Sequence, residues 1–169
     1  MDKEKAVAYY QMAADLDDEI ASCNYAFCLY EGIGCEVDDE KAFEYFEKAA
    51  AKDMPRALFY VGECYCFGRG VDKDEIKGMT HYKKAAQLRT AICYEYGIGV
   101  QEDYHEAATW YQEAANEGLE SAQLQLGYFY EAGEGVEQDP QLAVYWYQQA
   151  SHQNYAPAHC YLAYCYEMG

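Results

Sequence analysis

Apolar and polar positions along this chain form short amphipathic runs of two kinds. One kind, such as RALFYVGECYCFG at residues 56–68, has apolar residues at helical spacing and ends in glycine. The other, such as DEKAFEYFEKAA at residues 39–50, follows directly after an aspartate. An aspartate caps the free N–H groups of a starting helix, and glycine readily adopts the left-handed conformation that ends one. The pattern therefore predicts alternating helices, named helix A for the first kind and helix B for the second.

The two kinds of helix recur in a fixed register. The second glycine of each Gly-x-Gly turn recurs at spacings of 36, 29 and 36 residues, at Gly34, Gly70, Gly99 and Gly135. Five aspartates keep the same register, at Asp2, Asp38, Asp74, Asp103 and Asp139. Repeats of this length indicate stacked supersecondary units. We therefore expect an all-α fold, an α/α superhelical solenoid of about ten helices in antiparallel pairs with a right-handed superhelix.

Two positions of the repeat are expected to form the core. Helix A carries a small residue where neighbouring helices approach closely, and helix B carries an aromatic pair whose rings fill the space between layers. The small residues are Ala26, Gly62, Ala91, Gly127 and Ala163. The pairs are Tyr9 and Tyr10, Tyr45 and Phe46, His81 and Tyr82, Trp110 and Tyr111, and Trp146 and Tyr147.

The repeat follows the pattern A-x3-[LV]-G-x2-Y-x2-G-x-G-V-x2-D-x2-x-A-x2-[WY]-Y-x2-A-A. The best matches are AQLQLGYFYEAGEGVEQDPQLAVYWYQQA at 122–150 and GIGVQEDYHEAATWYQEAANEG at 97–118. This pattern resembles the Sel-one-like repeat family, a relative of the tetratricopeptide repeats, along essentially the whole chain. The resemblance implies an α/α solenoid that scaffolds protein complexes. Secreted members of that family staple each repeat with disulfides, whereas this chain has no regular cysteine pair in each repeat.

The repeats predict one solenoid domain over residues 1–169. Its parts are a half-repeat at 1–19, full repeats at 20–54 and 55–87, a shortened repeat at 88–118, a full repeat at 119–154 and a half-repeat at 155–169. The shortened copy lacks seven residues between Gln87 and Leu88. We expect its helix A to lose its first turns and the loop before it. Both ends present half-repeats without polar caps, so either longer flanking sequence is missing or the ends associate.

The charge of the chain restricts its partners. Twelve basic residues against thirty acidic ones give a formal net charge of −18. This charge repels phosphate backbones and argues against a nucleic-acid partner. It either keeps the chain soluble or steers it toward a basic partner. No signal-like segment opens the chain and no run of about 18 apolar residues crosses it, so we expect a cytoplasmic protein without a membrane role.

The eight cysteines and four histidines form no site that the sequence can identify. Most cysteines occupy repeat positions that hold Phe, Leu or Val in other copies, so we expect small buried hydrophobes with reduced thiols. No metal-ligand spacing, phosphate loop or nucleophile motif is present, so we expect neither a metal, a cofactor nor an enzyme. Some secreted relatives bind antibiotic-like ligands, and a small-molecule hydrolase is the third class that the resemblance implies.

Recognition is expected on helix A. The A helices of stacked pairs line the concave side, so helix-A residues outside the core positions are the candidates. Most of these residues are aromatic, and such rings supply contact area at low entropic cost, while glutamates beside them can pair with Lys or Arg. The alternative is that some of the rings close gaps between A helices.

We therefore expect a non-enzymatic adaptor whose concave, Tyr-rich, acidic face binds a peptide or helix of a partner protein. Homo-association through the terminal half-repeats is the competing class. The predicted binding residues are Phe27, Glu31, Tyr60, Glu63, Phe67, Tyr96, Tyr128, Tyr161 and Tyr164.

Overall fold

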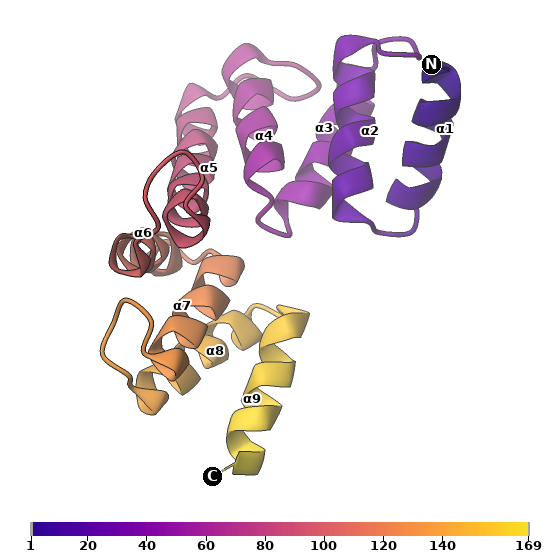
Figure 1. Ribbon diagram of the computed structural model, residues 1–169. Helices are drawn as coiled ribbons and strands as arrows, with labels where there is room; N and C mark the ends of the chain where they lie inside the picture. The colour runs from indigo at the N-terminus through magenta and orange to yellow at the C-terminus, as the bar shows by residue number, and fades with distance from the viewer. Residues whose placement is uncertain (1, 169) are drawn as a thin grey trace. The chain divides into compact units, whose positions relative to one another are not determined.

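The computed structural model describes residues 2–168, which contain nine α-helices and no β-strand (Figure 1). The helices are α1 (Lys3–Ala14), α2 (Glu19–Glu31), α3 (Asp39–Ala50), α4 (Pro55–Phe67), α5 (Glu75–Tyr96), α6 (Tyr104–Asn116), α7 (Glu120–Ala132), α8 (Pro140–His152) and α9 (Ala156–Met168). Helices α1, α3, α6 and α8 are the predicted B helices, and α2, α4, α7 and α9 are the predicted A helices. The predicted all-α repeat fold is confirmed.

The chain forms two compact units, unit 1 (Met1–Ala85) and unit 2 (Ala86–Gly169). In unit 1, α1 packs against α2, α2 against α3 and α3 against α4. In unit 2, α6 packs against α7, α7 against α8 and α8 against α9. Each unit thus contains a stack of four helices in which consecutive helices pack against one another. The single domain, its repeat boundaries and the handedness of a superhelix stay predictions.

Helix α5 corrects one expectation. The shortened repeat does not begin with a separate, truncated helix A, because residues 75–96 form one continuous helix of 22 residues. Elsewhere the turn that follows helix B contains a residue with positive φ, namely Asp17, Asp53, Gly118 or Asn154. The seven residues that the short copy lacks include this turn, so no left-handed residue stops the helix. Two helices of the repeat have therefore fused into one.

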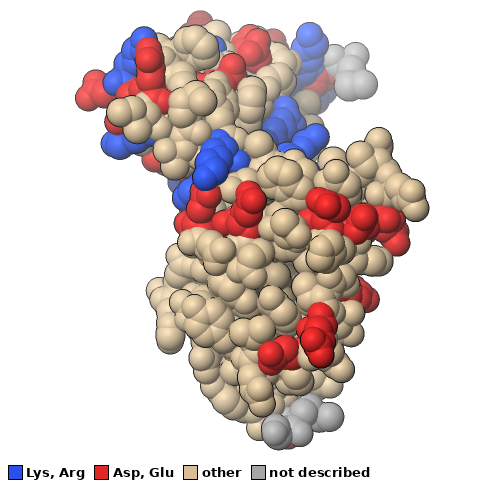
Figure 2. Space-filling view, turned by 90° about the vertical axis from the view of Figure 1, so that its left-hand side faces the viewer, with Lys and Arg blue, Asp and Glu red and all other residues tan. Residues whose placement is uncertain are grey.

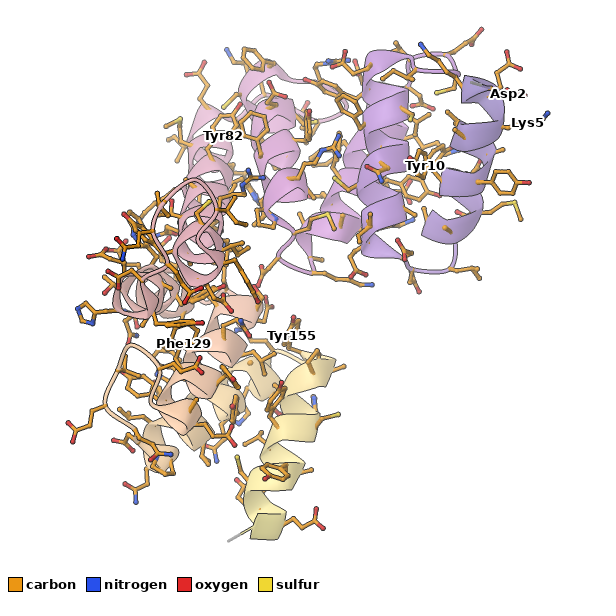
Figure 3. The ribbon with its side chains drawn as sticks, viewed as in Figure 1. Asp2, Lys5, Tyr10, Tyr82, Phe129 and Tyr155 are labelled. Atoms are coloured by element: carbon orange, nitrogen blue, oxygen red, sulfur yellow. The ribbon has the colours of Figure 1, made fainter. Side chains whose placement is uncertain are left out.

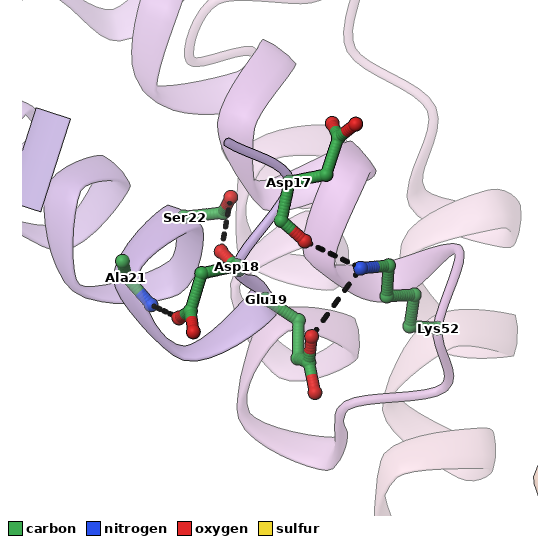
Figure 4. A network of polar contacts seen from close by, with 6 residues as sticks. All are labelled: Asp17, Asp18, Glu19, Ala21, Ser22 and Lys52. Carbon is green, nitrogen blue, oxygen red and sulfur yellow. Dashed lines mark hydrogen bonds and ion pairs between the residues drawn. The ribbon is translucent and has the colours of Figure 1, made fainter. Parts of the chain in front are cut away.

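A network of polar contacts stabilises the turn between α1 and α2 (Figure 4). Asp18 caps α2, since its Oδ1 accepts a hydrogen bond from the backbone N–H of Ala21 at 2.7 Å. Lys52, just after α3, donates to the backbone carbonyl of Asp17 at 2.5 Å and forms an ion pair with Glu19 at 3.3 Å. The turn after α3 is thus tied to the turn that precedes α2.

The predicted aspartate caps of the B helices are confirmed. The side chain of Asp139 accepts hydrogen bonds from the backbone N–H groups of Gln141 and Leu142, each at 3.0 Å. Asp2, Asp38 and Asp103 cap α1, α3 and α6 in the same way. The A helices α2, α4 and α7 end at left-handed glycines, Gly32, Gly68 and Gly133.

The core forms where the small residues of helix A meet the aromatic residues of helix B. A Cβ atom added to Gly127 would lie 2.5 Å from Cε1 of Tyr147, so only glycine lets this ring approach α7. Tyr147 and Phe46 are fully buried, as are Ala26 and Ala91. The core prediction is wrong for the pair on α1, where Tyr9 is 70% and Tyr10 38% exposed. Tyr10 is labelled in Figure 3. The core prediction is also wrong for Ala163, which is exposed on α9.

Candidate functional site

The predicted binding residues are divided between the two units. Unit 1 carries Phe27 and Glu31 on α2 together with Tyr60, Glu63 and Phe67 on α4. Unit 2 carries Tyr96 on α5, Tyr128 on α7, and Tyr161 and Tyr164 on α9. The structure brings some of these residues together in two separate clusters, one in each unit, which differ in what fills them, and leaves others apart.

In unit 1, two of the three predicted rings are already engaged by the protein itself. The rings of Phe27 and Tyr60 lie 5.5 Å apart between centroids. Tyr60 also stacks on the fully buried Phe46, with centroids 4.8 Å apart and planes inclined by 11°. The guanidinium carbon of Arg56 lies 4.8 Å from the centroid of Phe27 and 5.9 Å from that of Tyr60. Tyr60 therefore closes a gap between helices, which is the alternative role expected for some of these rings.

A second arginine fills the neighbouring part of the unit 1 surface. The guanidinium of Arg69 lies 3.4 Å from the ring centroid of Tyr30 and donates a hydrogen bond to Asp39 at 2.6 Å. Nearby, burial raises the pKa of the Glu63 carboxyl, Arg69 opposes this rise, and Glu31 adds to it. The acidic side chains of this cluster thus face a cation supplied by the chain.

In unit 2, three of the four predicted tyrosines line an open groove. Tyr128 and Glu131 of α7 and Cys160, Tyr161 and Tyr164 of α9 enclose about 260 Å³, and this groove is named the tyrosine groove. A second groove of about 560 Å³ shares Glu131 and Tyr164 with it and extends toward the start of α8. Tyr128, Tyr161 and Tyr164 are 40%, 39% and 52% exposed, so their rings remain available for contact.

Glu131 is held at the edge of the groove by a hydrogen bond that the sequence analysis missed. The hydroxyl of Tyr147 donates to Oε2 of Glu131 at 2.6 Å, and Tyr111 donates to Oε2 of Glu95 at the same distance. The sequence does contain a pattern that indicates these bonds, because each glutamate lies two residues before a helix-ending glycine and 16 residues before its tyrosine. These bonds fix the carboxylates on the A helices.

The remaining predicted residues are exposed and belong to no groove found in the described residues. Phe67 is 67% and Tyr96 64% exposed, and Glu31 is also exposed. They extend the aromatic and acidic surfaces at the C-terminal ends of α4, α5 and α2.

Charge is distributed unevenly between the units. Eleven of the twelve Lys and Arg residues lie in residues 1–85, and residues 86–169 contain one, Arg89, against twelve Asp and Glu. On the face drawn in Figure 2, Lys and Arg gather over one part of the molecule while another part carries acidic side chains alone. The tyrosine groove therefore lies in a strongly acidic unit, whose negative potential attracts cations.

The buried tyrosines predict a loss of stability at alkaline pH. Burial, reinforced by hydrogen bonds to Glu131 and Glu95, raises the pKa values of Tyr147 and Tyr111, and a hydrogen bond to Asp15 raises that of Tyr45 to about 12. An unfolded tyrosine titrates near pH 10. The folded state therefore binds these protons more tightly than the unfolded state. Their contribution to the free energy of unfolding is fully present below about pH 10 and is lost as the pH rises through the folded pKa values.

Chemical denaturation at a series of pH values should show this fall in the free energy of unfolding between about pH 10 and 12. Tyr147→Phe removes one titrating group and should flatten the dependence. An unfolding free energy that stays constant over this range would contradict the assignment.

The described residues give no indication of metal or membrane chemistry. They contain no group of three or more His, Cys, Asp and Glu side chains able to hold a metal ion, and none of their helices is long and apolar enough to cross a membrane.

Of the eight cysteine thiols, Cys23, Cys28 and Cys64 are buried, and burial raises the pKa of Cys64 to about 12. Cys160 is exposed in the tyrosine groove, so the expectation of a buried hydrophobe is wrong there.

Comparison with solved structures finds similar repeat proteins. The chain is 30% identical to c5321, a protective antigen of uropathogenic Escherichia coli with an SLR fold, at a TM-score of 0.52 over 99% of this chain and 38% of that chain. A Sel1 repeat protein from Oxalobacter formigenes is 32% identical over 96% of this chain and 49% of that chain, with a TM-score of 0.49. This chain thus spans half or less of the length of both proteins. No match was found among curated proteins.

The Sel1 repeat family model matches the chain in six segments. They are residues 2–18, 20–54, 55–90, 86–119, 120–155 and 156–169, and the third and fourth overlap within the fused helix α5. Together they cover nearly every residue, and the chain belongs to the Sel1 repeat family.

Proposed function

We propose that this chain is a non-enzymatic scaffold that binds a segment of a partner protein on the exposed faces of its A helices, with the tyrosine groove as the principal contact. The groove carries the proposal, because three tyrosines that the repeat leaves variable line one open cavity. Exposed tyrosines are among the residues that contribute most to binding energy at interfaces. Sel1 repeat proteins generally serve as protein interaction scaffolds, which supports the same function.

The proposed partner segment is a basic peptide or helix. Residues 86–169 carry twelve acidic side chains and a single basic one, so a cationic segment is attracted and an acidic one repelled. The proposed secondary contacts in unit 1 are Phe27, Glu31, Glu63 and Phe67, whereas Tyr60 packs on Phe46. We propose the cytoplasm as the site of action, where free thiols stay reduced.

The test is a selection of binding peptides on the purified chain. A displayed library of random linear peptides is selected on the wild-type protein, and each selected peptide is titrated against Tyr128→Ala/Tyr161→Ala. Each truncation at a true hot spot costs about 2 kcal/mol, or about thirtyfold in affinity, so the double variant should lose binding.

The matched control is Tyr145→Ala on α8, because Tyr145 is 47% exposed and lies outside the groove. This variant should bind the selected peptides like the wild type. Peptides that bind the double variant and the wild type equally well would overturn the proposal.

Self-association is a second candidate function, favoured by two exposed faces. Ala163 is exposed on α9, although the same repeat position is buried in α2, α4, α5 and α7. Tyr10 on α1 is 38% exposed, although its counterpart Tyr147 is fully buried. The two faces have the residue types that pair inside each unit. Concentration-dependent dimerisation that Tyr10→Ala abolishes would support this candidate over the first.

A further inference from the structure

Two rings in each of the two clusters occupy the same positions of the repeat. Phe27 and Tyr128 are 101 residues apart in the sequence, and so are Tyr60 and Tyr161. The pair on α2 and α4 in unit 1 therefore corresponds to the pair on α7 and α9 in unit 2. Comparison of these matching positions therefore shows which side chains unit 1 has beside its rings and unit 2 lacks.

Unit 1 fills its cluster with its own guanidinium. Arg56 lies over the rings of Phe27 and Tyr60, and its Nη1 donates a hydrogen bond to Oδ1 of Asn24 at 3.1 Å. Arginine suits this position because its planar cation stacks on aromatic faces while its N–H groups reach an acceptor at the side.

Unit 2 has no such cation at the corresponding position. The residue 101 positions after Arg56 is Pro157, which carries neither a charge nor a side-chain donor. The one basic residue in 86–169, Arg89, lies on α5 and does not line the tyrosine groove. The rings of Tyr128 and Tyr161 therefore lack the cation that the matching rings hold in unit 1.

Unit 2 instead adds an anion to the groove. Glu131 stands 101 positions after Tyr30, so a carboxylate replaces an aromatic ring at the edge of the cluster. Glu131 is half-buried, and the hydrogen bond from Tyr147 holds one of its oxygens. Together with three tyrosine rings, this carboxylate offers the stacking face and the charged acceptor that bind a guanidinium.

We propose that the tyrosine groove accepts an arginine side chain of the partner, which takes the place that Arg56 occupies in unit 1. This inference rests on the proposed function and names the side chain that the groove recognises. The partner's guanidinium stacks on Tyr128 and Tyr161 and pairs with Glu131, as the internal arginines of unit 1 stack on rings and pair with acceptors.

The test uses three blocked tripeptides, acetyl-Gly-X-Gly-amide, in which X is arginine, its neutral isostere citrulline, or lysine. Each is titrated into the full chain while NMR records the amide signals of α7 and α9. The arginine probe should shift the signals of the groove residues, and citrulline should bind about tenfold more weakly because it lacks the cation. Equal binding of arginine and citrulline, or of arginine and lysine, would overturn the inference.

A variant of the chain provides a second readout. Pro157→Arg gives unit 2 an arginine at the repeat position that Arg56 occupies in unit 1. This arginine should block the groove and weaken binding of the arginine probe about tenfold. Pro157→Ala is the matched control, since it removes the proline without adding a cation and should bind the probe like the wild type. Unchanged binding by Pro157→Arg would count against the inference.

Failure of the inference is distinguishable from failure of the proposed function. If selected peptides depend on Tyr128 and Tyr161 but the arginine probe shifts no groove signal, the groove binds protein and the arginine assignment is wrong. If no selected peptide depends on these tyrosines, the proposed function itself is wrong.

Discussion

Replacing Gly135 by alanine is expected to lower the melting temperature of the protein by about 10 °C, which for a chain of this size corresponds to roughly 3 kcal/mol. Gly135 has a φ of +67°, where a Cβ atom is strained. That atom would also lie 2.2 Å from the carbonyl oxygen of Tyr104, at the start of α6. The backbone must shift to relieve this contact, because no flexible side chain is involved. Thermal unfolding followed by circular dichroism measures the effect.

The chain provides a matched control at Gly99. This residue occupies the same position of the repeat and has a φ of +75°, but nothing lies within 4 Å of an added Cβ. Gly99→Ala therefore tests conformational strain alone and should cost only about 1 kcal/mol. Equal destabilisation by both substitutions would show that the close approach to Tyr104 contributes nothing.

Phe129→Ala is expected to destabilise the protein by about 3 to 5 kcal/mol, the range for removing a large buried aromatic side chain. Phe129 on α7 is fully buried (Figure 3), and its ring meets Tyr111 edge to face at a centroid distance of 5.7 Å. Removal of the ring leaves a cavity between α6 and α7, and its lining residues lose their packing contacts. Urea denaturation gives the change in the free energy of unfolding.

Tyr128→Ala, one residue earlier on α7, separates core from binding surface. Tyr128 is 40% exposed in the tyrosine groove, so its loss should change stability by only about 0.5 kcal/mol, as at most surface positions. The selected peptides should nevertheless lose affinity. A Tyr128→Ala protein that unfolds as easily as Phe129→Ala would place this ring in the core and remove it from the proposed binding surface.

Much of the fold was predictable because its determinants are local. The aspartate caps and the helix-ending glycines act within one turn of helix, so their spacing is enough to predict where helices begin and end. The fusion of two helices into α5 is also local in origin, since the short copy lacks the turn that holds Asp17 or Asp53 in other copies. The sequence shows no helix-ending residue near Gln87, but we expected two helices because the other repeats have two.

The binding surface was less predictable, because identical repeat positions have different neighbours. Tyr60 and Tyr161 occupy the same position on helix A, and each packs on the matching helix-B ring, Phe46 or Tyr147. Yet Tyr60 lies beside Arg56, while Tyr161 lines a groove without a cation. The sequence by itself determined the helices other than α5, the aspartate caps of the B helices and, except on α1 and α9, the positions that form the core, since these follow from periodicity within a few residues. Only the tertiary structure decided which rings are filled from within and which stay open, because that depends on side chains about 30 residues away on neighbouring helices.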